Sequence, residues 1–408
     1  MHPPERRPRL TPAIADVRRA VRDTLAEAAL APDDLVLVAL SGGPDSLALA
    51  AATAFEAPRA GLRAGAIIVD HSLQEGSDAV ASRAADQARS LGLAPVLVTR
   101  VQVGAVARAS AFGAERTRGG PEALARDIRY AAIDRAVVET GARAVLLGHT
   151  LDDQAETVLL GLARGAGAAS LTGMARFTPP PGAAADAHHD HGRAPAPAPA
   201  APAAAAGSAG VTPAPTRPAH VAPGTRIRPL LGIRRATTEA FCADSSLTPW
   251  HDPHNDSPDY ARVRVRRSVL PVLEAELGPG IAEALARTAD QLREDDDTLH
   301  DVAIETIEDL VEHAEAGIAV SVGALEANPP ALRNRIIRYV VESEFGVSLS
   351  RAQTLAAVAL VTDWHGQKGV DLPGIRVVRQ AGRLEFSRVH PGATAGDAAA
   401  GDTAAGDE

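Results

Sequence analysis

The chain has 408 residues, more than one hydrophobic core usually accommodates, so two or three domains are expected. Its 46% of apolar residues suit a globular, soluble protein, and no apolar run is long enough to cross a membrane. A single cysteine, Cys242, excludes a disulfide framework and any chemistry that needs two thiols. The first residues lack the apolar segment of a signal peptide, so we expect a cytoplasmic protein.

The net charge of −10 argues at first against a nucleic-acid partner, but its distribution changes that interpretation. Residues 290–315 contain eleven acidic residues and one arginine, so this stretch carries the whole net charge. The rest of the chain is balanced and has room for basic patches. Its positive charge is almost entirely arginine, which suits bidentate contacts to phosphate.

Strand and helix patterns alternate along the N-terminal part of the chain. Short apolar runs predict strands at 35–40, 64–69, 95–101 and 144–147. Amphipathic patterns predict a helix from Thr11, one after Ser46, and others at 77–91, 121–140 and 152–164. The alternation predicts an α/β fold with a Rossmann-like parallel sheet covered on both faces. Ligands bind beyond the carboxyl ends of the strands in such sheets.

The loop between the first strand and its helix is a candidate phosphate site. It consists of Ser41, Gly42, Gly43, Pro44, Asp45 and Ser46. The glycines let the backbone approach an oxyanion, and the serine hydroxyls and the helix N-terminus supply donors. Asp45 can help to hold Mg²⁺ against phosphate. Pro44 follows the second glycine where the Walker loop has a lysine, and a plain β-turn is the alternative interpretation.

A second polar segment, residues 148–157, follows the strand at 144–147. Asp152 and Asp153 precede Glu156 by four and three residues, so a helix places the three carboxylates on one face. Grouped carboxylates can hold Mg²⁺, bind an ammonium group or act as a base. Helix capping is the alternative, but it does not account for His149 and a third acid. Asp70 and His71 also follow a strand, so three segments point to one edge of the sheet.

Residues 226–267 contain eight arginines and five acids. The excess of arginine forms a candidate RNA-binding patch, with a solvated surface as the alternative.

Residues 178–225 are mainly alanine and proline, and we expect a disordered insertion there. His188 to His191 lie in this insertion, and we favour a solvated tract over a metal site. Helices are predicted at 281–316, 329–344 and 351–361, then a β-hairpin at 369–386 with Val377, Val378 and Leu384 inside.

Several motifs resemble those of one enzyme family. SGGPDS at 41–46 resembles the SGGxDS loop of the ATP-pyrophosphatase superfamily, whose members cleave ATP to AMP and pyrophosphate. HTLDDQAET at 149–157 and VDHSL at 69–73 resemble segments of its tRNA(Ile)-lysidine synthetase branch. Further segments resemble this branch in the same order: EALARDIRY at 122–130, RGAG and LTGM within 164–174, RPLL at 228–231 and WHDPHN at 250–255. The resemblance covers about residues 33 to 275.

The resemblance implies an adenine nucleotide α-hydrolase type of fold and a reaction that uses ATP and Mg²⁺. The first anticodon cytidine of a CAU-bearing tRNA(Ile) is adenylated, and free L-lysine then displaces AMP to form lysidine. It implies catalytic roles for Asp45, His149, Asp152, Asp153 and Glu156, with Mg²⁺ on Asp45 and Asp153. ATP is expected at residues 41–46, Asp70, His71 and Arg126. tRNA is expected at Arg129, Arg228, Arg262, Arg264 and Arg266.

The expected domain organisation follows from these features. Residues 1–177 form an ATPase domain, 178–225 the insertion, 226–275 the completion of the catalytic domain, 276–390 a mainly helical domain with a small β element, and 391–408 a disordered tail. We expect no membrane partner, and a homodimer is plausible for the family. A tRNA thiolase is a rival, disfavoured because Cys242 lies outside the motifs. A non-catalytic, nucleotide-sensing RNA-binding protein is a second rival, disfavoured by the intact acids.

Overall fold

The computed structural model describes residues 10–70, 76–101, 121–165, 167–180, 221–252, 257–308, 311–314 and 317–389. The chain divides into an N-terminal unit, residues 1–292, and a C-terminal unit, residues 293–408. Most of the expected insertion, the expected tail, His71 and His188 to His191 lie outside the described residues. Among the described helices, none combines the length and the apolar character that a membrane crossing requires.

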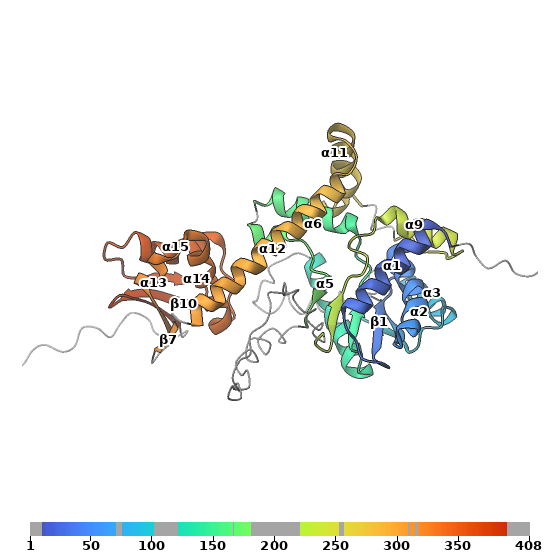
Figure 1. The fold of residues 1–408 in the computed structure, drawn as a ribbon, viewed down its shortest axis with the longest axis horizontal. Helices are drawn as coiled ribbons and strands as arrows, with labels where there is room; N and C mark the ends of the chain where they lie inside the picture. Colours follow the sequence, from blue (N-terminus) through green and yellow to red (C-terminus); the bar gives the residue numbers. More distant parts are fainter. Residues whose placement is uncertain are drawn as a thin grey trace, which may run out of the picture. The chain divides into compact units, whose positions relative to one another are not determined.

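The N-terminal unit, coloured from blue to yellow in Figure 1, is built on a six-stranded sheet with the order β3-β2-β1-β4-β6-β5. The parallel strands are β1 (Leu35–Ala39), β2 (Arg63–Asp70), β3 (Val96–Arg100), β4 (Ala144–Leu146) and β6 (Thr225–Ile227). The edge strand β5 (Phe177–Thr178) pairs antiparallel with β6. The predicted α/β fold with a mostly parallel sheet is confirmed.

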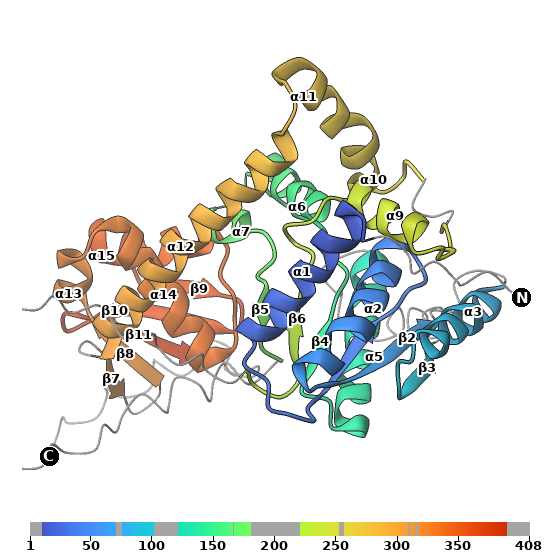
Figure 2. The ribbon, with the colours of Figure 1, turned by 45° about the vertical axis from the view of Figure 1, so that its right-hand side comes forward.

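Alternation of side chains along the strands explains how helices cover both faces of this sheet. Val36, Val38 and Ile68 pack in one cluster with α1 (Pro12–Glu27), α2 (Pro44–Glu56), α3 (Ser77–Ser90) and α9 (Arg235–Asp244). Leu35, Leu37 and Ile67 belong to a second cluster with α5 (Pro121–Thr140). Figure 2 shows α2 and α3 beside the sheet near β2 and β3. Adjacent residues of one strand therefore pack into the cores on opposite faces of the sheet.

A group of helices packs together beyond the carboxyl end of β4. This group contains α6 (Leu151–Ala163), α7 (Ala168–Leu171), α10 (Ala261–Arg264), a π-helical turn (Val265–Val269), α11 (Leu270–Leu277) and the start of α12 (Ile281–Glu308). Leu151 and Ala155 of α6 pack with Val265, Leu270 and Ala282. This apolar contact places the arginines around the π-helical turn next to the acidic residues of α6.

The C-terminal unit contains a five-stranded antiparallel sheet with the order β7-β8-β11-β10-β9. Its strands are β7 (Val311–Ala314), β8 (Gly317–Ser321), β9 (Val370–Leu372), β10 (Ile375–Gln380) and β11 (Arg383–Arg388). The helices are α13 (Val322–Ala327), α14 (Pro330–Phe345) and α15 (Arg351–Thr362), together with the end of α12. Val320, Leu384 and Phe386 of the sheet share one core with Ile336 and Val358 of the helices.

Two details of the predicted C-terminal region are wrong. The predicted helix at 281–316 ends at Glu308, and β7 follows because it pairs with β8 through register partners such as Val311 and Val320. Strand pairing here overrides the helical pattern of the sequence. In the predicted hairpin, Val377 and Leu384 are buried, but Val378 pairs with Glu385 on the opposite face and is half-buried.

Candidate active site

The loop of residues 41–46 is held in a compact conformation. The Ser46 hydroxyl donates to the Gly43 carbonyl at 3.0 Å and accepts from the Ser41 amide at 3.2 Å. Gly42 has φ +87°, a conformation that glycine adopts without strain, and its carbonyl accepts from the Trp250 amide at 2.8 Å. A Cβ on Gly148 would lie 3.0 Å from the Ser46 amide nitrogen, so the segment after β4 packs directly on the loop. The loop's backbone donors therefore have a fixed geometry.

Helix α6 begins with a capping box that uses one of the candidate catalytic acids. Thr150 is the N-cap, and its hydroxyl accepts from the Asp153 amide at 3.4 Å. Asp153 Oδ2 accepts from the Thr150 amide at 2.8 Å. The other carboxylate oxygen, Oδ1, is bound by Arg235. Capping and a place in the site are thus compatible for Asp153, because each uses a different oxygen.

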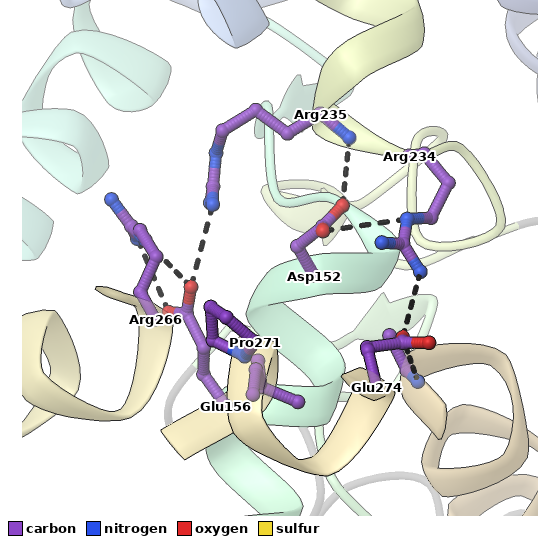
Figure 3. A pocket seen from close by; sticks show the side chains of 9 residues that line it. Asp152, Glu156, Arg234, Arg235, Arg266, Pro271 and Glu274 are labelled. Atoms are coloured by element: carbon purple, nitrogen blue, oxygen red, sulfur yellow. Dashed lines mark hydrogen bonds and ion pairs between the residues drawn. The ribbon is translucent and has the colours of Figure 1, made fainter. Parts of the chain in front are cut away.

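Arg235, the first residue of α9, lies at the centre of the acidic residues. Its guanidinium donates to Asp45 Oδ2 at 3.3 Å, to Asp153 Oδ1 at 2.9 Å and to Glu156 Oε1 at 3.4 Å. Its backbone amide donates to Asp152 Oδ2 at 2.7 Å. Figure 3 shows this side chain reaching towards Glu156 while its backbone nitrogen meets Asp152. One residue therefore binds all four predicted catalytic carboxylates.

Three further arginines also contact these acids. We call the four acids and the four arginines the carboxylate–arginine network: Asp45, Asp152, Asp153, Glu156, Arg234, Arg235, Arg262 and Arg266. Glu156 is fully buried and accepts two bonds from Arg266, at 2.7 and 3.1 Å. The Arg262 guanidinium lies 3.3 Å from Glu156 Oε2. Arg234 lies 3.4 Å from Asp152 Oδ1 and 2.9 Å from Glu283 (Figure 3 shows the Asp152 contact). Every acid of the network has an arginine partner.

Burial and charge shift the protonation equilibria in this network. Burial lowers the pKa of Arg235, but the surrounding carboxylates outweigh it and raise that pKa overall. Burial opposes ionisation of Asp153, yet Arg235 and the Thr150 amide bring its pKa below the ordinary value. For Asp45, burial dominates and raises the pKa, although Arg235 and the Thr238 hydroxyl bind its carboxylate. Asp153 therefore holds its negative charge more firmly than Asp45.

His149 precedes the network, and its low pKa favours the neutral imidazole at neutral pH. Burial lowers its pKa to about 4, with arginines adding to the effect and Asp153 opposing it. Its Nδ1 is buried and has no hydrogen-bond partner among the described residues. A neutral imidazole at this position can exchange hydrogen bonds with a substrate without carrying charge.

A cavity of about 140 Å³ adjoins the network. Three acids, Asp152, Glu156 and Glu274, and three arginines, Arg234, Arg235 and Arg266, line it together with Leu270, Pro271 and Ala282 (Figure 3). The pKa of Glu274 is lowered by backbone amides at the start of α12, against the effect of its burial. The cavity thus offers both signs of charge beside a small apolar wall, which suits a zwitterionic ligand.

The structure does not bring all predicted site residues to this network. Asp70 ends β2 and pairs with Arg100 at 3.0 Å. Arg126 and Arg129 are exposed on α5, where Arg126 donates to the Tyr130 hydroxyl at 3.3 Å. Arg228 is buried and donates to the Ala175 carbonyl and the Thr178 hydroxyl, at 2.7 and 2.8 Å. Arg264 is exposed and donates to the carbonyls of Pro258 and Asp259.

Arg234, Arg235 and Thr238 are the site residues that the sequence analysis did not single out. The two arginines follow the RPLL segment, and in sequence they resemble the other arginines of the candidate RNA-binding patch. The useful signal is their position at the start of α9, the helix that follows β6, which is the strand beside β4. That position places Arg235 at the same sheet edge as residues 41–46.

Cys242 lies beneath the loop, within α9. Its thiol donates to the Pro44 carbonyl at 3.5 Å, and burial raises its pKa to about 12. A thiolate is therefore unfavourable at neutral pH. This residue packs against the loop and is poorly suited to sulfur transfer.

Gln154 connects two further motif segments. Its side-chain amide donates to the Met174 carbonyl at 2.9 Å, and its oxygen accepts from the Met174 amide at 2.7 Å. Gly173 has φ +66°, and a Cβ there would lie 2.6 Å from the Gln154 oxygen. The LTGM segment is thus fixed against α6, which is a structural role for this glutamine.

Within the described residues, no group of three or more histidine, cysteine, aspartate or glutamate side chains is arranged to hold a metal ion. Asp45 and Asp153 instead share the Arg235 guanidinium. Two aspartate carboxylates at a phosphate loop are nevertheless the kind of oxygen donors that Mg²⁺ uses together with nucleotide phosphates.

The chain is similar to known proteins along most of its length. Residues 15–195 match a family model described as a PP-loop domain, and residues 321–385 match one described as the TilS substrate binding domain. A tRNA(Ile)-lysidine synthase of Leifsonia xyli is 55% identical over 89% of this chain and 91% of its own. That of Salinispora tropica is 44% identical over 94% and 98%. Among solved structures, a U34-tRNA thiolase from Methanococcus maripaludis is 18% identical over 69% and 80%, with a TM-score of 0.48.

Proposed function

The chain belongs to the tRNA(Ile)-lysidine synthase family, and from this premise we propose which of its residues carry each part of the reaction. It is an ATP-dependent ligase that forms lysidine on tRNA(Ile). We infer that the reaction adenylates C2 of the first cytidine of the CAU anticodon and that free L-lysine then displaces AMP. The convergence of Asp45, Asp153 and Glu156 on Arg235 beside the 41–46 loop is the observation that carries the residue assignments.

We assign the ATP phosphates to residues 41–46. The backbone amides at the N-terminus of α2 and the hydroxyls of Ser41 and Ser46 stabilise negative charge that develops on the leaving pyrophosphate. Asp70 and Arg126 remain the proposed contacts to the rest of the nucleotide, together with His71 outside the described residues. Asp70 is buried at the end of β2, where its partner Arg100 keeps the carboxylate in place.

We propose that Mg²⁺ binds Asp45 and Asp153 together with ATP. When bound, the ion neutralises charge on the phosphates and favours departure of pyrophosphate. Arg235 contacts both carboxylates in this structure, at 3.3 and 2.9 Å, so its guanidinium has to leave at least one of them. The contact of Arg235 with Asp45 is the longer of the two, and burial raises the pKa of Asp45. Arg235 therefore releases Asp45 more readily than Asp153.

We assign free lysine to the cavity beside the network. Asp152 and Glu156 attract the cationic amino acid, and Arg234 or Arg266 receives its carboxylate. The apolar wall of Leu270 and Pro271 suits the methylene groups of the side chain. The α-groups then stay in the cavity while the ε-amine points to the reaction centre.

His149 is proposed to act in its neutral form. With a pKa of about 4 in the free protein, its imidazole is a hydrogen-bond acceptor at neutral pH and holds a proton poorly. The negative charge of bound ATP raises this pKa, because an anion nearby favours the imidazolium. His149 is thus prepared to exchange a proton only when the nucleotide is present.

For tRNA we retain Arg129 and Arg264, which are exposed, as proposed phosphate contacts. Arg262 and Arg266 bind Glu156 and are better assigned to the network, whereas Arg228 is buried and is not proposed as an RNA contact. A cytoplasmic location and a homodimer remain proposals, and sedimentation of the purified protein with and without tRNA tests the second.

A lysine-incorporation assay tests the proposed function. Protein, ATP, Mg²⁺ and labelled lysine are mixed with CAU-bearing tRNA(Ile) or with tRNA(Met) as a control. We expect label in tRNA(Ile) alone and an equal amount of AMP. AMP without label would point to another nucleophile, and the absence of AMP would favour the non-catalytic alternative.

A further inference from the structure

Three arginines lie close together in the C-terminal unit: Arg335 and Arg338 on α14 and Arg351 at the start of α15. We call them the C-terminal arginine cluster. Arg335 and Arg338 are three residues apart, so they share one side of α14. Helices α14 and α15 pack against each other (Figure 1). The charges of Arg335 and Arg351 both act on Arg338, which places the three guanidinium groups within electrostatic reach.

The cluster lacks a full set of counter-ions among the described residues. Arg335 is bound to Asp296 of α12 at 2.5 Å. No hydrogen bond or ion pair joins Arg338 or Arg351 to another described residue. Asp296 and Glu342 oppose the like charges of Arg335 and Arg351 around Arg338. Arg338 is half-buried, and burial is the main reason that its pKa is lowered. An anion at this position would relieve the unfavourable burial of positive charge.

Other arginines of the same unit do not share this property. Arg376 pairs with Asp371 at 2.7 Å, and Arg333 donates to the Leu325 carbonyl at 2.7 Å. Arg379 donates to the carbonyls of Leu360 and Val361, both at 3.1 Å. These guanidinium groups have protein acceptors, so they gain less from an added anion than Arg338 and Arg351 do.

We propose that Arg338 and Arg351 bind a backbone phosphate of the tRNA, with Arg335 held beside them by Asp296. This inference rests on the proposed function, because it takes tRNA as the substrate. Guanidinium groups bind phosphate oxygens in bidentate geometry, and a second guanidinium group within electrostatic reach adds to the attraction for the anion. All three arginines lie within residues 321–385, the region that matches the TilS substrate binding domain. The start of α15 adds the positive end of a helix dipole.

The test compares Arg338→Gln, Arg351→Gln and Arg338→Lys with Arg376→Gln, an equal loss of charge in the same unit. Binding of a CAU-bearing tRNA(Ile) transcript to the full-length protein is measured by fluorescence anisotropy at several salt concentrations. Each Gln variant of the cluster is expected to bind roughly three- to tenfold more weakly, with a salt slope lower by about one. Arg338→Lys keeps most of the slope, and Arg376→Gln matches the wild type.

Equal affinity and slope for Arg338→Gln, Arg351→Gln and Arg376→Gln would overturn the proposal. Arg351 is exposed at a helix start, so its variant provides the test if Arg338→Gln does not fold. Inorganic phosphate is titrated in parallel, and displacement of tRNA by phosphate at low millimolar concentration would indicate a free-anion site in place of an RNA contact. Lysine incorporation by the wild type is measured in the same preparations, so that failure of the proposed function is distinguished from failure of this site.

Discussion

The carboxylate–arginine network of the N-terminal unit and the C-terminal arginine cluster use arginine in different ways. In the N-terminal unit, Arg235, Arg262 and Arg266 are bound to carboxylates. In the C-terminal unit, Arg338 and Arg351 lack such partners among the described residues, although the same side chain is used. In the network, carboxylates balance the arginine charges without a ligand. In the cluster, the proposed phosphate supplies the missing negative charge. A ligand that enters the network therefore has to replace existing ion pairs. A ligand at the cluster forms new contacts without breaking any such pair.

This difference has consequences for binding. Removing one member of a buried ion-pair network leaves charge without compensation, which is strongly unfavourable. An exposed or half-buried cation in water loses much less when its anion is absent. Removing an arginine from the network should therefore change both stability and catalysis, whereas substitutions in the cluster should change tRNA affinity alone.

Arg235→Gln should give the largest effect and would break the balance of the network. It leaves Asp45, Asp153 and Glu156 without their shared cation, and Glu156 is fully buried. We expect lysidine formation to fall below detection and the N-terminal unit to lose roughly 3–5 kcal/mol of stability. Thermal unfolding and AMP release measure the two effects. For the unfolding measurement, Arg264→Gln is the control with the same change of charge, because this exposed arginine is bound only to carbonyls within the described residues.

Should Arg235→Gln unfold at the temperature of Arg264→Gln, the carboxylates would not depend on this guanidinium for compensation. The contrast between the two units would then fail at its strongest point.

Asp45→Asn should separate catalysis from stability. Burial already raises the pKa of Asp45, so a neutral amide of similar shape is tolerated by the fold. We expect AMP release to fall about a hundredfold or more, because a ligand for Mg²⁺ and its phosphates is lost. The unfolding temperature should stay close to that of the wild type. Normal AMP release by this variant would rule out the Mg²⁺ assignment.

The fold and the convergence of the acids follow from local patterns in the sequence. Alternating apolar residues such as Val36 and Leu37 define strands with two buried faces, and the polar segments directly after the strands lie at one edge for that reason. The spacing of Asp152, Asp153 and Glu156 requires only a helix at that place. Such features depend on residues a few positions apart, which a single sequence displays.

The identity of the arginine partners depends on distant contacts and was not predictable in the same way. Arg235 and Asp45 are 190 positions apart, and the eight arginines of 226–267 look alike in sequence. Packing of α6 against the segment around Val265 decides that Arg266 meets Glu156, whereas Arg228 turns into the interior. The error at β7 has the same origin, since a strand there depends on its partner β8.

The smallest predicted effect concerns pH and His149, which belongs to the N-terminal unit but lies outside its ion pairs. Its pKa falls from 6.5 to about 4 on folding, so the unfolded chain takes up the proton first as pH decreases. The free energy of unfolding should therefore be unaffected above pH 6.5 and decrease between pH 6.5 and 4, by no more than about 3 kcal/mol. His149→Gln removes this dependence, whereas His365→Gln, at an exposed turn of the C-terminal unit, keeps it. Thermal unfolding of the three proteins across this range measures the difference.

Parallel curves for the wild type and His149→Gln would mean that the imidazole titrates alike in the folded and unfolded chains. With saturating ATP the wild-type dependence should become weaker, because the phosphate charge raises the pKa of His149 in the folded state.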